Sequence, residues 1–178
     1  LVMCGVNSFG TEWVGEQLAK FMQPGQKLLI ITKGMRADED GTLHLLPNVI
    51  KSHFDPELAE SISWNAITGP SIAGELAVHH HTAVVFCGHD QDDLDYIANL
   101  FRTDYYHVWT SLDFNGYETG AATKNVYAFA AGFAKGLLRK EGKENDRYVM
   151  HNYSAAIFAQ GQRELTSFIK LMGGDPET

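Results

Sequence analysis

The sequence predicts an α/β domain followed by an all-helical segment, and three observations support this fold class. Short apolar runs alternate with longer amphipathic segments over the first two thirds of the chain, which is typical of α/β layers. Residues 27–32 are almost continuously apolar, as expected for a strand of a parallel sheet that is covered on both faces. After residue 117 no strand pattern occurs, and apolar residues recur at helical spacing.

The elements follow from these patterns in chain order. Strands are expected where apolar and β-branched residues run together, at residues 1–5, 27–32, 65–68, 82–87 and 105–110. Helices are expected where apolar residues recur every three or four positions, at residues 11–22, 55–61, 91–101, 117–138 and 153–172. A polar turn is expected at residues 38–41 and a charged connection at residues 139–146. The change of pattern predicts an α/β domain over residues 1–112 and a helical domain over residues 113–178.

Composition limits the function classes. The chain has 178 residues, of which 44% are apolar and 20% charged, enough for one domain or parts of two. A net charge of −8 argues against nucleic-acid binding, which needs clustered cations. We find no apolar stretch long enough to cross a membrane and no signal peptide, so we expect a cytoplasmic protein with no membrane insertion.

Two features of the chain concern its cysteines and its ends. Cys4 and Cys87 each stand in an apolar run, so we expect buried thiols in a reducing compartment and no disulfide. The chain begins at Leu1, without methionine, inside an apolar run. We therefore expect it to be an excerpt of a longer protein.

Lys124 is the strongest candidate for a functional residue. It follows glycine and small residues and precedes Asn125, so backbone and ligand can approach closely there. Small residues recur at every fourth position of the predicted helix, which gives a ribbon of Gly116, Gly120, Lys124, Ala128, Gly132 and Gly136. Neighbouring members share a face, although the ribbon rotates slowly around the helix because the repeat is about 3.6 residues. Glycine in a helix costs about 1 kcal/mol relative to alanine, which indicates either close helix packing or close ligand approach. The residues alone leave both interpretations open.

Two further candidates follow predicted strands, where ligands bind in open α/β sheets. Lys33 follows the strand at residues 27–32 and could pair with a phosphate or a carbonyl; from its position alone, a surface lysine is the simpler interpretation. Gly69-Pro70-Ser71 offers backbone N–H groups and a hydroxyl, although such a segment is more often a plain turn and helix cap.

Two other motifs are set aside. His79, His80 and His81 are consecutive, and neighbouring side chains of an extended segment point to opposite faces. An exposed loop is therefore a better interpretation than a metal site. The glycine-containing segment at residues 5–10 lacks the Gly-x-Gly-x-x-Gly spacing of a dinucleotide-binding loop.

Four segments, in order, resemble the NAD(P)-dependent glycerol-3-phosphate dehydrogenase family. They are Ile31-Thr32-Lys33-Gly34, the Gly-Pro-Ser-Ile-Ala-Gly-Glu-Leu-Ala run at residues 69–77, the Gly-Ala-Ala-Thr-Lys-Asn run at 120–125, and Gly-Gly-Asp-Pro-Glu-Thr at 173–178. The resemblance implies a Rossmann-like domain, incomplete here, followed by a helical domain like that of 6-phosphogluconate dehydrogenase. It also implies NAD or NADP as cofactor and the interconversion of dihydroxyacetone phosphate and sn-glycerol 3-phosphate.

The resemblance assigns roles to individual residues. Lys124 matches the lysine that exchanges a proton with the substrate oxygen, Lys33 the strand-end lysine that contacts substrate and cofactor, and Asn125 the asparagine beside the catalytic lysine. The implied catalytic set is Lys124, Lys33 and Asn125, the substrate-binding set is Lys33, Gly69, Ser71 and Lys124, and the cofactor-binding set is Ala73, Lys33 and Phe9.

The chain departs from the family pattern in several places. Asn7 stands where the family has proline, and Gln160 where arginine is common. The glycine-rich cofactor loop and the arginine that binds phosphate do not occur within the chain. Two alternatives therefore stay open: a related 2- or 3-hydroxy acid dehydrogenase, and a non-catalytic nucleotide-binding homologue. The expected partners are a small phosphorylated substrate and, from the habit of the family, a second copy in a homodimer.

Overall fold

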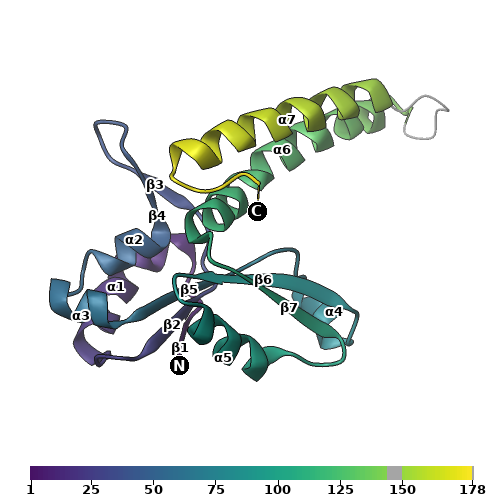
Figure 1. The fold of residues 1–178 in the computed structure, drawn as a ribbon. Coiled ribbons are helices and arrows are strands. Elements are labelled where there is room, and N and C mark those ends of the chain that lie inside the picture. The colour runs from purple at the N-terminus through teal and green to yellow at the C-terminus, as the bar shows by residue number, and fades with distance from the viewer. Residues whose placement is uncertain (144–149, 178) are drawn as a thin grey trace.

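The computed structural model describes residues 1–143 and 150–177. A five-stranded sheet in the order β1-β2-β5-β6-β7 forms the first part of the molecule, with a separate two-stranded hairpin, β3-β4 (Figure 1). The strands are β1 (Val2–Cys4), β2 (Lys27–Ile30), β3 (Met35–Ala37), β4 (Leu43–Leu45), β5 (Ser63–Thr68), β6 (Thr82–Gly88) and β7 (Tyr106–Ser111). The predicted α/β class with a helical second part is confirmed.

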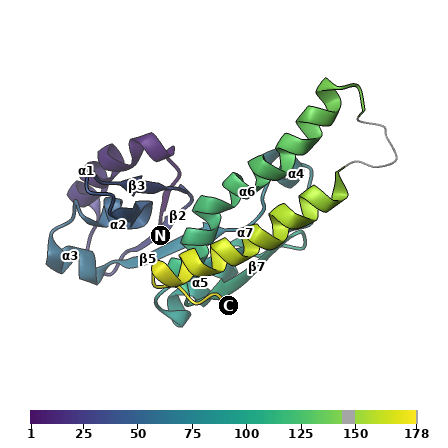
Figure 2. The same ribbon diagram turned by 90° about the horizontal axis from the view of Figure 1, so that it is seen from above.

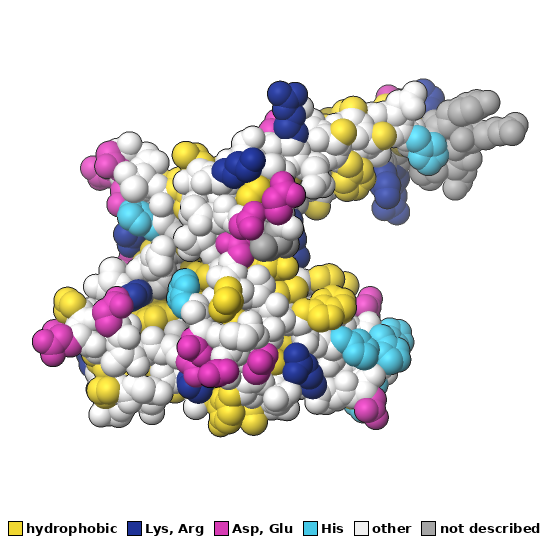
Figure 3. All heavy atoms as spheres, in the orientation of Figure 1, with side chains coloured by type: hydrophobic (Ala, Val, Ile, Leu, Met, Phe, Trp, Pro, Cys, Tyr) yellow, Lys and Arg dark blue, Asp and Glu magenta, His cyan; other side chains and the backbone are white. Residues whose placement is uncertain are grey.

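Helices pack on the sheet and then extend away from it. They are the 3₁₀ turn η1 (Ser8–Gly10) and the helices α1 (Thr11–Phe21), α2 (Leu46–Lys51), α3 (Pro56–Ser61), α4 (Ala73–Ala77), α5 (Gln91–Phe101), α6 (Phe114–Lys140) and α7 (His151–Leu171). Helices α6 and α7 run side by side as an arm over the sheet (Figures 1 and 2). The space-filling view shows a hollow between this arm and the sheet (Figure 3).

Strand β2 lies inside the sheet and is covered on both faces, as its apolar run predicts. It pairs in parallel with β1 and with β5. Leu28, Leu29 and Ile30 are all fully buried. Leu28 and Ile30 belong to the core cluster that includes residues of α1, α2 and α3, whereas Leu29 belongs to the cluster with α5. This alternation follows from the two-residue period of a strand.

The expectation of a parallel sheet is wrong for one pair of strands. β6 runs antiparallel to β5, with Asn65 opposite Gly88 and Thr68 opposite Val85. The connection between them holds only the five-residue helix α4, which rises about 7–8 Å and cannot return the chain along a six-residue strand of about 20 Å. The chain therefore turns back and pairs in the opposite direction.

The predicted polar turn at residues 38–41 is the turn of the β3-β4 hairpin. Asp38 donates its backbone N–H to Thr42, and Gly41 donates to Asp38. The two strands have three residues each, too short to give an alternating pattern in the sequence. The hairpin follows Lys33 and Gly34 directly, so it begins where β2 leaves the sheet.

Helix α6 starts three residues earlier than predicted, because Asp113 caps it. The Asp113 carboxylate accepts the backbone N–H of Gly116 at 3.0 Å, which satisfies one of the free donors of the first turn. The described part of the charged connection predicted at residues 139–146 ends at residue 143, and the remainder lies outside the described residues.

Most glycines of the predicted ribbon on α6 do not serve close packing among the described residues. A Cβ atom at Gly120, Gly132 or Gly136 would meet no other heavy atom within 4 Å. Close approach occurs instead at the base of the helix, where Gly174, just after α7, lies against Gly116. A Cβ atom at Gly174 would lie 2.4 Å from the Cα of Gly116.

Cys4 and Cys87 are free and buried, as their apolar surroundings predict. Burial raises the pKa of both thiols above the ordinary value. Because the thiolate is the reactive form, we expect neither cysteine of the folded protein to react with a disulfide reagent at about pH 8, while both react after unfolding in urea. Rapid release of one equivalent of chromophore from the folded protein would contradict this expectation.

Candidate active site

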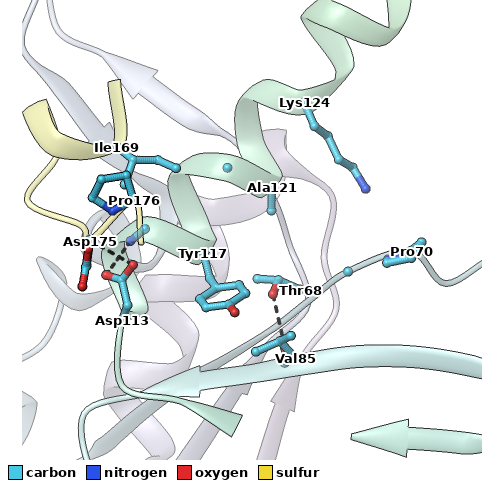
Figure 4. Close-up of a pocket in the computed structure, with 13 residues that line it drawn as sticks. Thr68, Pro70, Val85, Asp113, Tyr117, Ala121, Lys124, Ile169, Asp175 and Pro176 are labelled. Atoms are coloured by element: carbon cyan, nitrogen blue, oxygen red, sulfur yellow. Dashed lines mark hydrogen bonds between the residues drawn. The ribbon is translucent and has the colours of Figure 1, made fainter. Parts of the chain in front are cut away.

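A pocket of about 410 Å³ lies between the end of β5, the first turns of α6 and the segment after α7. Figure 4 shows the residues that line it. They are Thr68, Gly69, Pro70, Val85, Asp113, Gly116, Tyr117, Gly120, Ala121, Lys124, Ile169, Asp175 and Pro176. The pocket thus joins the carboxyl end of a parallel strand to the helical part, which is where α/β proteins bind ligands.

Lys124 stands at one end of this pocket. Its side chain leaves α6 and extends toward the loop at Pro70 (Figure 4). Tyr117, Gly120 and Ala121 lie on the same side of α6, because positions three and four apart share a helix face. The side chain is exposed, and within the described residues its ammonium makes no ion pair or side-chain hydrogen bond. A cation in this position is available to a ligand.

Gly69 lines the same pocket as Lys124. Its φ of +112° lies in the region that favours glycine. A Cβ atom there would lie 3.1 Å from the Cα of Val84 and 3.3 Å from the carbonyl oxygen of Ala83. Both the backbone angle and the neighbouring strand therefore require glycine, and the chain can pass close to β6 before it turns outward.

Lys33 lies outside this pocket, past the end of β2. Its ammonium lies 2.9 Å from a carboxylate oxygen of Glu118 and donates to the carbonyl oxygens of Ile31 at 3.2 Å and Thr32 at 3.3 Å. The Glu118 side chain is fully buried. Burial raises the pKa of its carboxyl, and the charge of Lys33 opposes this shift only in part.

The remaining predicted residues do not line the pocket. Ser71 is exposed in the loop before α4, and Ala73 is exposed as the first residue of α4. Asn125 is exposed on α6 next to Lys124. Phe9 is 96% exposed in η1. Of the seven predicted site residues, the structure brings Gly69 and Lys124 together in one pocket, and it places Lys33 one strand away.

Asn7, which stands where the family pattern has proline, makes a contact that explains this departure. Its side chain caps η1 by accepting the backbone N–H of Gly10 at 3.0 Å. Proline has no side-chain acceptor, so asparagine gives this turn a contact that the family's proline lacks. The neighbouring Val6 carbonyl accepts a hydrogen bond from the Thr32 hydroxyl at 2.6 Å, which ties the loop after β1 to the end of β2.

Glu118, Asp113 and Tyr117 are site residues that the sequence interpretation missed. Asp113 carries a recognisable signal, since an aspartate three residues before Gly116 is a common helix cap. Glu118 carries a weaker signal: it is an acidic residue in a run of small and apolar ones, six positions before Lys124. Its partner Lys33 is 85 residues away in the chain, so no local pattern connects the two.

The histidine-rich segment lies away from the pocket. The His79 ring stacks on Tyr105 at a centroid distance of 4.2 Å, and His81 Nδ1 lies 2.9 Å from His107 Nε2. Histidine side chains gather at the end of the sheet next to α4 (Figure 3). Their rings thus have different partners.

In residues 1–143 and 150–177, no helix combines the length and the apolar character that crossing a bilayer requires.

The sheet and the arm of two helices define a protein with a Rossmann-like α/β N-terminal part and a helical C-terminal part. A family model described as the NAD-dependent glycerol-3-phosphate dehydrogenase N-terminus matches residues 1–94, and the model of the C-terminus matches residues 113–178. The chain belongs to the NAD-dependent glycerol-3-phosphate dehydrogenase family.

Individual relatives agree with this family. A glycerol-3-phosphate dehydrogenase (NAD(P)+) of Geobacter sulfurreducens is 35% identical over 91% of this chain and 44% of its own length. An NADP(+)-dependent glycerol-3-phosphate dehydrogenase of Archaeoglobus fulgidus is 29% identical over the whole chain and 50% of its own length. The chain therefore spans about half the length of the curated relatives it matches.

A solved structure shows the same fold. The glycerol-3-phosphate dehydrogenase of Coxiella burnetii superimposes with a TM-score of 0.79 over 98% of this chain and 48% of its own chain, at 22% sequence identity. The antiparallel β6 and the α6–α7 arm therefore belong to a fold that an experimental structure contains.

Proposed function

We propose that this protein interconverts dihydroxyacetone phosphate and sn-glycerol 3-phosphate by hydride transfer with NADH or NADPH. The observation that carries the proposal is the position of Lys124, an unpaired cation among the described residues, above the pocket at the end of β5. Membership in the NAD-dependent family supports hydride transfer with a nicotinamide cofactor. The names of the relatives support glycerol 3-phosphate as the substrate.

Lys124 has the chemistry that a ketone reduction needs. Dihydroxyacetone phosphate gains a hydride at its carbonyl carbon and a proton at its carbonyl oxygen. We assign the proton transfer to Lys124, whose ammonium donates to the oxygen during reduction and whose amine accepts the proton in the reverse direction. The same positive charge stabilises the negative charge that develops on the oxygen.

The residues near Phe9 fit the nicotinamide end of the cofactor. The Phe9 ring is 96% exposed and Ile31 is 43% exposed, both just past the ends of β1 and β2. An exposed apolar surface of this kind suits stacking with a planar ring. When bound, NADH or NADPH supplies the hydride. The chain's own residues would hold the ring through Phe9, Ala73 and Lys33, while Gly69 and Ser71 would contact the substrate.

The remaining family-derived expectations are part of this proposal. We infer that Asn125 assists Lys124 from the next position on α6, and that the domains divide between residues 112 and 113. A homodimer in the cytoplasm and a small phosphorylated substrate complete the proposed description. Size-exclusion chromatography with light scattering tests the dimer directly.

The test of the function is a substrate comparison with the full-length protein. We expect loss of NADH or NADPH absorbance at 340 nm with dihydroxyacetone phosphate, and little with unphosphorylated 2-keto or 3-keto acids. Faster turnover of a keto acid would favour a related hydroxy acid dehydrogenase. Nucleotide binding without turnover of any of these substrates would favour a non-catalytic homologue.

A further inference from the structure

An ion pair connects the sheet to the helical part. Among the described residues, the other ion pairs lie within the α/β part or just after α6, between Glu141 and Lys143. The pair of Lys33 and Glu118 instead joins the segment after β2 to α6. Its acidic member is fully buried, and the basic member keeps 24% of its side chain exposed.

The ammonium of Lys33 contacts three oxygen-bearing groups. These are the carboxylate of Glu118 at 2.9 Å and the carbonyl oxygens of Ile31 and Thr32 at 3.2 and 3.3 Å. The two carbonyl contacts are hydrogen bonds, whereas the contact with Glu118 is an ion pair in which the buried carboxylate oxygens have no hydrogen-bond partner among the described residues. A ligand that binds Lys33 through more than one hydrogen bond must replace at least one of the carbonyl groups.

The three contacts differ in strength. Glu118 is the shortest contact and carries a charge, whereas the two carbonyl groups are neutral and farther away. A full negative charge attracts the ammonium more strongly than the dipole of a neutral carbonyl group does, and a buried ion pair is screened little by solvent. The carbonyl contacts are therefore the ones that a ligand can replace.

We propose that Glu118 is a positioning residue, which holds the Lys33 ammonium at the junction of β2 and α6 while a ligand anion or carbonyl replaces its two backbone acceptors. This inference rests on the proposed function. Helix α6 would then contribute two residues to the reaction: Lys124, which lines the pocket, and Glu118, which holds Lys33. It also accounts for a glutamate that stays buried although burial disfavours its charge.

Glu118→Gln tests the proposal, because glutamine keeps the shape of the side chain and removes its charge. We expect kcat/KM for dihydroxyacetone phosphate to fall about 10- to 100-fold. We expect the urea midpoint to change little, because the variant no longer buries the charge of Glu118 and the remaining Lys33 ammonium is partly exposed to water. A contact that is merely structural would instead lower the midpoint and leave kcat/KM unchanged.

A double-mutant cycle identifies the residue through which Glu118 acts. If it acts through Lys33, Glu118→Gln will cost less than about 3-fold in a Lys33→Ala background. An equal loss in both backgrounds would overturn the proposal. The matched control is Glu60→Gln, which breaks an exposed Lys–Glu ion pair of 2.8 Å with Lys51 and should leave kcat/KM unchanged.

A second readout does not depend on activity. The amine of Lys33 can be acylated with an acetyl ester and quantified by mass spectrometry, with Lys140 as an internal reference. We expect Lys33 to react several-fold faster in Glu118→Gln than in the unsubstituted protein. If the unsubstituted protein does not reduce dihydroxyacetone phosphate, the proposed function fails, and this rate still decides whether Glu118 holds Lys33. Equal rates would overturn the positioning role.

Discussion

Replacing Lys124 with alanine is expected to lower kcat for dihydroxyacetone phosphate reduction by about 10²–10⁴-fold, while binding of NADH persists. The change removes both the proton donor and the charge that stabilises the developing oxyanion. The nucleotide contacts assigned to Phe9 and Ala73 are on other elements and stay intact. Steady-state kinetics gives kcat, and the fluorescence of bound NADH gives its Kd.

Two variants sharpen this prediction. Lys124→Arg keeps the positive charge, but a guanidinium does not release its proton near neutral pH, so we expect KM for dihydroxyacetone phosphate to stay near that of the unsubstituted protein while kcat is low. Lys140→Ala removes an exposed lysine at the far end of the same helix and should leave both parameters unchanged. Near-normal kcat in Lys124→Ala would refute the assigned role.

Gly174→Ala is expected to destabilise the fold by about 2–3 kcal/mol. A methyl group there would lie 2.4 Å from the Cα of Gly116, 2.5 Å from its backbone nitrogen and 2.9 Å from Cγ2 of Ile169. Backbone atoms cannot rotate away as a flexible side chain can, so the end of α7 must move from the base of α6. Urea unfolding followed by circular dichroism measures the loss.

The matched control for this prediction is Gly136→Ala. That glycine is also helical, but its added methyl group would meet no other heavy atom within 4 Å. We therefore expect it to raise stability by up to about 1 kcal/mol, the usual helical preference for alanine. The interpretation would fail if the two variants shifted the urea midpoint in the same direction. Asp175 and Pro176 line the pocket directly after Gly174, so Gly174→Ala should also raise KM.

The parts of the fold that could be predicted are those with a local signal. The buried run of β2 and the amphipathic stripes of α1 and α5 are visible in a few neighbouring residues, and the structure has all three. The direction of β6 and the short β3-β4 hairpin have no such signal. The direction of β6 depends on where the chain leaves α4. The hairpin consists of three-residue strands that pair with each other.

The residues of the candidate site also divide into those with a local signal in the sequence and those without one. Local context makes Lys124, Gly69 and Lys33 candidates, and the family resemblance assigns their roles. Gly69 and Lys124 line one pocket, whereas the three contacts of Lys33 have no local signal. Its charged partner lies on a different element, and the other two acceptors depend on how the backbone bends after β2.

Among the described residues, helix α6 meets the α/β part at its base, and α7 packs along the rest of it. Phe114, Gly116, Glu118 and Thr119 are buried at its base, whereas most of the helix beyond Lys124 is exposed among the described residues. A helix rises about 1.5 Å per residue, so Lys124 lies ~15 Å along the rod from its root and a tilt of ~5° there would carry it ~1 Å sideways. A displacement of that size can change a reaction rate about 100-fold. Small changes of tilt near Gly116 would therefore displace Lys124, the proposed proton donor, farther than they displace the base of the helix.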